Sequence, residues 1–449
     1  MKEKCQSLDI FSSAPVPEAV FKNALPAMAA MLMVLVYNLA DTFFIGQTHD
    51  VLMVAAVSLA TPVFLLFMAV GTVFGIGGTS VISRAMGEGR KEYAKKVSSF
   101  CMWSCIIVGF LMSLILFLFM NSILKLIGTS EGTREMTRIY LKIVIVSGPF
   151  VLIGNCFSNV LRAEGQSAKA MAGMVIGNLL NVILDPIMIL GFDWGIAGAA
   201  IATVIGNFAG AGYYVYYFLH GDSMLSIRPH DFTVKEKVLS GVLSIGIPAS
   251  LGTVLMSISS ILLDNHMAQY SDMAVAGIGV AIKVAMMTSL VCIGLGQGIQ
   301  PLLGYCCGAK DRERYLKVFH FSVLFALILS TMMTAICYIF TNDIVNAFVT
   351  DKKAFEYGVS FSRILLSTSF LFGIYYVILN ALQAVGAAIP SLIINLSRQG
   401  LIYIPALLLL ETIFGLKGLV WAQPVADVVS VLLAIRIYCL RLKSENIWF

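Results

Sequence analysis

Charged residues are scarce in this sequence: 12% of its 449 residues are charged, whereas 59% are hydrophobic. A soluble globular protein carries about 25% charged residues, so half that level excludes an ordinary soluble domain and indicates an integral membrane protein. The net charge of +5 does not indicate nucleic-acid binding, because the positive residues lie in short loops between apolar runs.

Motifs of soluble enzymes are missing as well. No GxxxxGK[ST] sequence is present, and GIGGTS at residues 75–80 lacks the third glycine of the dinucleotide-binding fingerprint. The nine cysteines have neither zinc-site nor disulfide-framework spacing, and several lie inside apolar runs, as small buried residues do. We therefore expect no enzymatic activity and no cofactor. Without a nucleotide site, any energy that the protein uses would have to come from an ion gradient.

Long apolar runs are abundant. A helix of about 20 apolar residues, at 1.5 Å per residue, crosses the roughly 30 Å hydrocarbon core of a bilayer. The first run, residues 25–46, follows a polar stretch and is too long for the apolar part of a signal peptide, so we expect a membrane span. In total the sequence predicts an all-α membrane protein of twelve spans, centred near residues 35, 66, 108, 150, 179, 207, 254, 287, 328, 370, 400 and 428.

Lysine and arginine are concentrated on one side of these spans. The loops after spans 2, 6 and 8 and both chain ends hold most of them, so the positive-inside rule predicts that both termini lie in the cytoplasm. The loops on the opposite side hold fewer, chiefly Lys125, Arg134, Arg138, Lys142, Lys352, Lys353 and Lys417.

The chain also contains an internal repeat. Gly87, after one glycine-rich stretch, matches Gly308, and SNVLRAEG, ending at Gly165, matches LNALQAVG, ending at Gly386. Both offsets are 221 residues (308 − 87 and 386 − 165), which implies two six-helix bundles related by a pseudo-two-fold axis along the membrane normal. The expected parts are a cytoplasmic segment 1–22, an N-lobe 23–219, a cytoplasmic loop 220–240, a C-lobe 241–442 and a cytoplasmic tail 443–449.

Asp41 lies inside the first span, where an ionisable group costs several kcal/mol unless it has partners, water or a function. At 1.5 Å per residue, Asp41 lies about 24 Å from the cytoplasmic start of its span, and Asn181 and Asp185 about 20 and 25 Å up span 5. Thr203 lies about 12 Å below the outer end of span 6, and Tyr37 is one turn before Asp41. We expect these five residues to meet in the outer half of the N-lobe.

Two carboxylates with amide, hydroxyl and phenol oxygens suit either of two tasks. They can share a proton, because two like charges cannot both ionise cheaply in a low-dielectric pocket. They can also bind a hard cation such as Na⁺ through oxygen ligands. The alternative is structural: Asp185, which precedes Pro186, could brace a helix break, and Tyr37 could simply pack.

The C-lobe has intramembrane charges of its own. Lys283, Arg398 and Asp427 lie at similar depth, and an unpaired charge there would be costly, so we expect a network of the three. Asp264 lies further out on span 7. A static ion-pair brace and a role in handling substrate or protons are both open interpretations.

Several motifs, in one order along nearly the whole chain, resemble the multidrug and toxin extrusion (MATE) family: YNLADTFFIG, RAMGEG, NVLRAEG, NLLNVILDP and QGIQPLLGY with GAK. The first lobe resembles the DinF-type branch, and the motifs around Lys283, Arg398 and Asp427 resemble the MepA-like branch. One departure is Asn380, before Gln383, where NorM-type members place an acid. Ion coupling should therefore depend on the first lobe.

The resemblance implies an exporter of small organic cations and amphipathic drugs in the bacterial plasma (inner) membrane, driven by H⁺ or Na⁺ antiport. It assigns the proton or cation site to Asp41, Asn181, Asp185 and Thr203, with the backbone at Ala199 as a further ligand. We expect a monomer in contact with membrane lipid and without nucleic acid. An alternative is a flippase or exporter of a lipid-linked or other endogenous metabolite, but that would need a more cationic cleft and extra spans.

Overall fold

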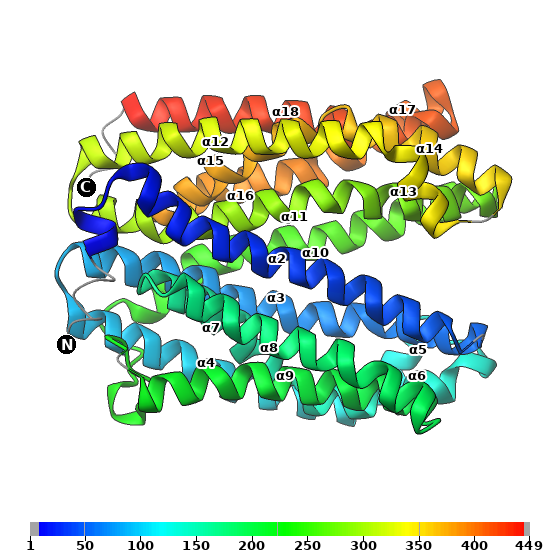
Figure 1. Cartoon of the computed structure of the whole chain (residues 1–449), viewed down its shortest axis with the longest axis horizontal. Coiled ribbons are helices and arrows are strands. Elements are labelled where there is room, and N and C mark those ends of the chain that lie inside the picture. The colour runs from blue at the N-terminus through cyan, green and yellow to red at the C-terminus, as the bar shows by residue number, and fades with distance from the viewer. Residues whose placement is uncertain (1–8, 49, 222, 350, 444–449) are drawn as a thin grey trace. The chain divides into compact units, whose positions relative to one another are not determined.

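The structure is a computed structural model that describes residues 9–48, 50–221, 223–349 and 351–443. The first eight residues, and the predicted C-terminal tail from residue 444 on, lie outside the described part. Helices make up nearly all of it (Figure 1). The helices of the first repeat are α2 Val16–Gly46, α3 Val51–Gly87, α4 Lys91–Leu118, α5 Met120–Leu126, α6 Glu131–Val146, α7 Gly148–Ala163, α8 Ser167–Pro186, the π-helix η1 Ile187–Gly191 and α9 Gly195–His220.

The second repeat follows a short 3₁₀ turn, η2 Pro229–Asp231, in the connecting segment. Its helices are α10 Val238–Ala268, α11 Asp272–Gly308, α12 Arg312–Ile339, α13 Thr341–Phe348, α14 Lys352–Leu366, the 3₁₀ turn η3 Ser369–Leu371, α15 Phe372–Ala384, α16 Ala388–Leu396, the π-helix η4 Ser397–Leu401, α17 Tyr403–Phe414 and α18 Leu416–Lys443.

The prediction of a many-span helical membrane protein is confirmed. Among the described residues, ten helices are long and apolar enough to cross a bilayer, and α6 with α7, bent by 55°, makes an eleventh span. With α18, which is 28 residues long, twelve segments are long enough to span the bilayer.

The internal duplication is visible in the helix boundaries. Helices α3 and α11 are both 37 residues long, and α4 and α12 are both 28 residues long. The two glycines matched in the sequence, Gly165 and Gly386, both have positive φ angles, of 81° and 79°. Since a side chain is strained in that conformation, the same turn requires glycine in both repeats.

The chain forms two compact units. Among the described residues, the first contains 9–13 and 32–250, and the second contains 14–31 and 251–443. Helices α2 and α10 therefore each contribute to both units, and the boundaries fall inside them, at Met31/Leu32 and Ser250/Leu251. The predicted lobe boundaries, which assign whole helices to each lobe, stay a prediction.

Within the first unit, α8 and α9 pack with their backbones in contact (Figure 1). A Cβ atom added to Gly206 would lie 2.6 Å from the carbonyl oxygen of Gly177, and one added to Gly177 would lie 2.9 Å from that of Gly206. Small residues at such a crossing allow close approach between membrane helices. The contact brings Asn181, one turn after Gly177, against the helix that carries Thr203.

Helix α8 ends at Pro186 and continues as the π-helix η1. Proline has no N–H to donate to the preceding turn, and π-helical turns are frequent at functional sites. Asp185 is thereby placed at a break in helix geometry rather than in a regular turn.

Candidate functional site

Four of the predicted N-lobe residues meet in the first unit. Oriented so that its nitrogen faces an acceptor, the Asn181 amide donates a 2.9 Å hydrogen bond to Oδ2 of Asp185 and accepts one of 3.0 Å from the backbone N–H of Thr203. The carboxyl groups of Asp41 and Asp185 interact electrostatically. Asp185, Asn181 and Thr203 are 0%, 3% and 5% exposed, whereas Asp41 is half-buried, so the cluster is largely enclosed but open to solvent on the side of Asp41.

Ala199, the fifth residue implied by the resemblance, lies one turn before Thr203. Its carbonyl oxygen accepts a 3.0 Å hydrogen bond from the Thr203 hydroxyl. The carbonyl is therefore adjacent to the cluster, and its oxygen is already an acceptor there.

Two tyrosines complete the cluster. Tyr37, predicted from its position before Asp41, and Tyr140 of α6 both interact with the Thr203 side chain and with the charges of both aspartates. Tyr140 was not found from the sequence. It lies in an amphipathic helix of ordinary appearance, and nothing in the spacing of spans 1 and 4 shows that they face each other.

Among the described residues, both aspartates have a buried carboxyl oxygen that makes no hydrogen bond. In the described part of the chain, Oδ1 of Asp41 and Oδ1 of Asp185 are buried and have no hydrogen-bond partner. A buried acceptor without a partner is expensive, particularly when it carries charge. Two such oxygens in one cluster are therefore suited to hold a proton or a cation.

An apolar wall lies beside this cluster. Ile45, Met53, Ile189, Ile196 and Ala199 form a buried core against which Tyr140 packs. These side chains come from α2, α3, η1 and α9. Because the wall lowers the local dielectric constant, charge interactions inside it are stronger than in water.

In the second unit, the predicted pairing of Arg398 with Asp427 is present. Nε of Arg398 donates a 2.7 Å hydrogen bond to Oδ1 of Asp427. The same carboxylate accepts hydrogen bonds from Gln423 (2.9 Å) and Thr368 (3.3 Å). The guanidinium carbon of Arg398 lies 4.6 Å from the centre of the Phe372 ring.

The other predicted C-lobe residues do not join this pair. Lys283 lies over the ring of Phe348, 5.4 Å from its centre, and makes no ion pair within the described residues. The expected three-member network is therefore wrong for Lys283, because Phe348 rather than Asp427 faces its ammonium group. Asp264 is exposed on α10, whereas Gln383 is buried, 2% exposed, on α15.

Asn380 has a structural role that the repeat explains. Its amide donates a 2.8 Å hydrogen bond to the carbonyl of Tyr376, as Asn159 in the first repeat donates one of 2.9 Å to Asn155. In both repeats this asparagine lies against a glycine of the neighbouring helix, Gly296 or Gly75. An asparagine at this position is thus common to both repeats.

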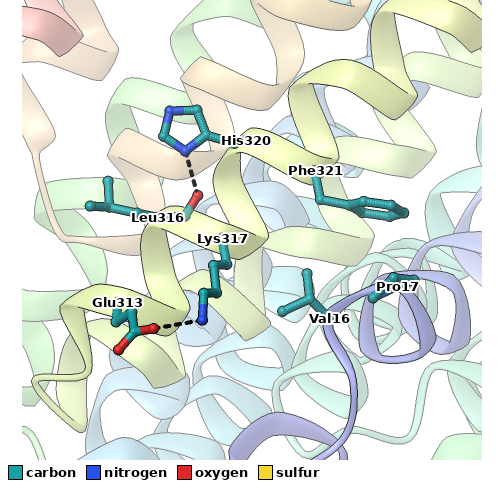
Figure 2. A pocket seen from close by; sticks show the side chains of 7 residues that line it. All are labelled: Val16, Pro17, Glu313, Leu316, Lys317, His320 and Phe321. Carbon is teal, nitrogen blue, oxygen red and sulfur yellow. Dashed lines mark hydrogen bonds and ion pairs between the residues drawn. The ribbon is translucent and has the colours of Figure 1, made fainter.

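A separate hollow of about 520 Å³ lies in the second unit, between the start of α2 and α12. Figure 2 shows Val16 and Pro17 opposite Phe321, with Lys317 paired to Glu313 at 2.6 Å. None of the predicted site residues lines this hollow. No group of three or more His, Cys, Asp or Glu side chains suited to a metal occurs in the described ranges.

A repeated, many-span helical fold with acids inside its membrane spans is typical of membrane transporters. The MatE family model matches residues 26–187 and 248–409, two regions offset by 222 residues (248 − 26). The chain belongs to the MatE family, whose members are transporters and not enzymes.

Relatives and solved structures agree with this assignment. The multidrug export protein MepA of Staphylococcus aureus is 32% identical over 445 residues, which cover 98% of this chain and 97% of that protein. MepA of Staphylococcus haemolyticus is 30% identical over the same shares of the two chains. The structure of a multidrug resistance MATE family transporter in an outward-facing conformation has a TM-score of 0.93, at 22% identity and coverage of 98% and 99%. Since these relatives are bacterial and the chain spans the membrane many times, the protein belongs in the plasma membrane.

Proposed function

We propose that this chain is a cation-coupled antiporter that exports cationic or amphipathic organic compounds by alternating access, with both termini in the cytoplasm. The export of several drugs is suggested by the name of its MepA relatives. The coupling is suggested by one observation, the pair of buried carboxyl oxygens on Asp41 and Asp185 that lack hydrogen-bond partners.

The exchange follows from the cost of buried negative charge. In the empty state, the two carboxyl groups repel each other in an apolar pocket. Either an incoming ion or a cationic drug relieves this cost, so the two cations compete rather than bind together. Binding of the ion therefore weakens binding of the drug, which is the thermodynamic requirement for antiport.

Helix α2 connects the neutralisation of Asp41 in the first unit to the second unit. Asp41 and Tyr37 lie in its second half, within the first unit, whereas residues 16–31 of the same helix belong to the second. A change in the packing of α2 around a neutralised Asp41 would therefore act on both units through one continuous helix. In this scheme, neutralisation favours the state that releases drug, and loss of the ion restores the state that binds it.

The coupling ion is H⁺ or Na⁺, and the hydrogen-bond pattern favours H⁺. A hard metal cation needs several oxygen ligands. Here the Asn181 amide oxygen, Oδ2 of Asp185 and the Ala199 carbonyl each already accept a hydrogen bond, so a metal cation would have to share these oxygens, whereas the two buried Oδ1 atoms have no partner among the described residues. A single proton shared by two carboxyl groups needs no further ligands.

The test is transport by the purified full chain in liposomes under separately imposed gradients. Efflux of ethidium should be driven by a proton gradient without Na⁺, and should collapse when an ionophore removes that gradient. Transport driven only by Na⁺ would reassign the ion but keep the antiport. Ethidium movement that ignores both gradients would refute the coupling.

A further inference from the structure

The connection between spans 3 and 4 and the first half of span 4, helix α6, carry cations that the transport scheme does not use. Lys125 lies on the short helix α5, and Arg134, Arg138 and Lys142 lie on α6. They are on the side of the membrane where the positive-inside rule expects few cations. Arginines at 134 and 138 are four residues apart, so they lie on one face of their helix.

The structure gathers three of these cations around one hollow. A cavity of about 580 Å³ is lined by Asn121, Lys125, Glu131, Arg134, Glu135 and Arg138. Three of these side chains are cationic and two are acidic, so the lining has an excess of one positive charge. It lies entirely within the first unit.

The two arginines of the cavity differ in the hydrogen bonds that their guanidinium groups make. Arg138 is held in place, since it donates 2.8 Å and 3.1 Å hydrogen bonds to Glu135 and Asn121. The Nε of Arg134 is buried and has no hydrogen-bond partner within the described residues. The Arg134 side chain as a whole is only half-buried, so the rest of its guanidinium group is accessible to an acceptor from outside the chain. A charged donor group that is not satisfied within the protein favours such an acceptor.

The second repeat shows that the fold does not require this polar cavity. Helix α6 begins at Glu131 and α14 at Lys352, again an offset of 221 residues (352 − 131). With this offset, Arg134 and Arg138 correspond to Phe355 and Val359, which pack against an apolar core in the second unit. The same helix face is therefore an ordinary apolar contact in one repeat and a basic cavity in the other.

The surroundings of the cavity are apolar and exposed. Leu118 and Phe119 at the end of α4 are 68% and 60% exposed, and Leu126, next to Lys125, is 86% exposed. Side chains of this kind at the end of a membrane span face lipid. The basic cavity thus adjoins a surface for acyl chains, at the level where the helices leave the bilayer.

We propose that Lys125, Arg134 and Arg138 form a binding site for the phosphate headgroup of an anionic phospholipid, whose acyl chains lie along Leu118, Phe119 and Leu126. The planar guanidinium groups match the geometry of phosphate oxygens, and basic pockets at membrane helices bind anionic headgroups. The net charge of +1 of the lining matches the single negative charge of such a headgroup.

The test compares phospholipid retention by the detergent-solubilised full chain, measured by native mass spectrometry after exposure to equal amounts of phosphatidylglycerol and phosphatidylcholine. The wild-type chain should retain phosphatidylglycerol preferentially. The R134Q/R138Q variant should lose this preference by at least about tenfold, because it removes two charged hydrogen-bond donors. The matched control is K352Q/K353Q, which removes two exposed cations at the start of α14 and should retain the wild-type preference.

Three results would overturn the proposal. One is an unchanged preference in a folded R134Q/R138Q variant, and another is an equal loss in K352Q/K353Q. The third is displacement of the bound lipid by soluble glycerol phosphate, which would identify a site for a free anion instead. If R134Q/R138Q does not fold, the wild-type chain is tested at two salt concentrations instead. Raising NaCl from about 50 mM to about 500 mM should weaken the preference for phosphatidylglycerol, because salt screens ionic interactions. A preference that does not change with salt would exclude an ionic headgroup site.

Discussion

Arg398 and Asp427 form a buried ion pair inside the second unit, with Nε 2.7 Å from Oδ1 and side chains that are 8% and 1% exposed. A second nitrogen of Arg398 donates a 3.1 Å hydrogen bond to the hydroxyl of Tyr376, and three aromatic rings surround the guanidinium group. The Arg398 guanidinium group and the Asp427 carboxylate therefore each have further hydrogen-bond partners in addition to one another. Each charge depends on the other, because neither has access to bulk water.

Replacing Asp427 by Asn should destabilise the protein by about 3–5 kcal/mol, because it leaves the Arg398 charge buried without its counter-ion. The measurement is the midpoint of thermal unfolding in detergent. The double variant R398M/D427N removes both charges at similar volume and keeps an amide oxygen as acceptor for Gln423, so it should recover most of the loss. A D427N variant as stable as wild type would show that the pair is not a brace.

Asp41→Asn should abolish gradient-driven ethidium transport in liposomes while leaving the protein folded. The amide has a similar shape but cannot take up a proton or carry the negative charge that a cation neutralises. The matched control is D343N, on an exposed carboxylate of α13 in the second unit that is not among the predicted site residues, which should transport at the wild-type rate. Full coupled transport by a folded D41N variant would contradict the assignment of the coupling site.

Gly206→Ala should separate helices α8 and α9, because the new methyl group would lie 2.6 Å from the carbonyl oxygen of Gly177. We expect a loss of about 1–3 kcal/mol in stability and weaker transport, since Asn181 would move away from Thr203. The control is G212A on the same helix, where nothing lies within 4 Å of the added atom. Equal thermal stability of the two variants would argue against the close crossing.

Tyr140→Phe should weaken ion binding without abolishing transport. Loss of one hydroxyl that interacts with Thr203 and the two aspartates corresponds to about 0.5–1.5 kcal/mol, or a change of about two- to tenfold in the ion concentration for half-maximal transport. The measurement is drug efflux at a series of ion concentrations. Y216F, on an exposed tyrosine of α9, should have no effect. An unchanged ion dependence in Y140F would remove Tyr140 from the cluster.

The sequence alone was sufficient for properties that depend on local composition and spacing. A span is recognisable because roughly 20 consecutive apolar residues are needed to cross the hydrocarbon core, whatever surrounds them. The duplication was readable from Gly165 and Gly386, since a turn that needs a positive φ angle needs glycine in both copies. Asp41, Asn181 and Asp185 were identifiable because polar groups at that depth are rare and expensive.

Tertiary structure decided which of these polar and charged side chains inside the membrane spans contact one another. Depth along a span gives no information about the rotation of a helix or about its neighbours, so Lys283 was expected beside Asp427 and instead faces Phe348. For the same reason, the amphipathic pattern of α6 alone does not show that Tyr140 joins the Asp41 cluster or that Arg134 lines a cavity. The period of a helix shows which residues share a face, but only packing between helices determines what that face contacts.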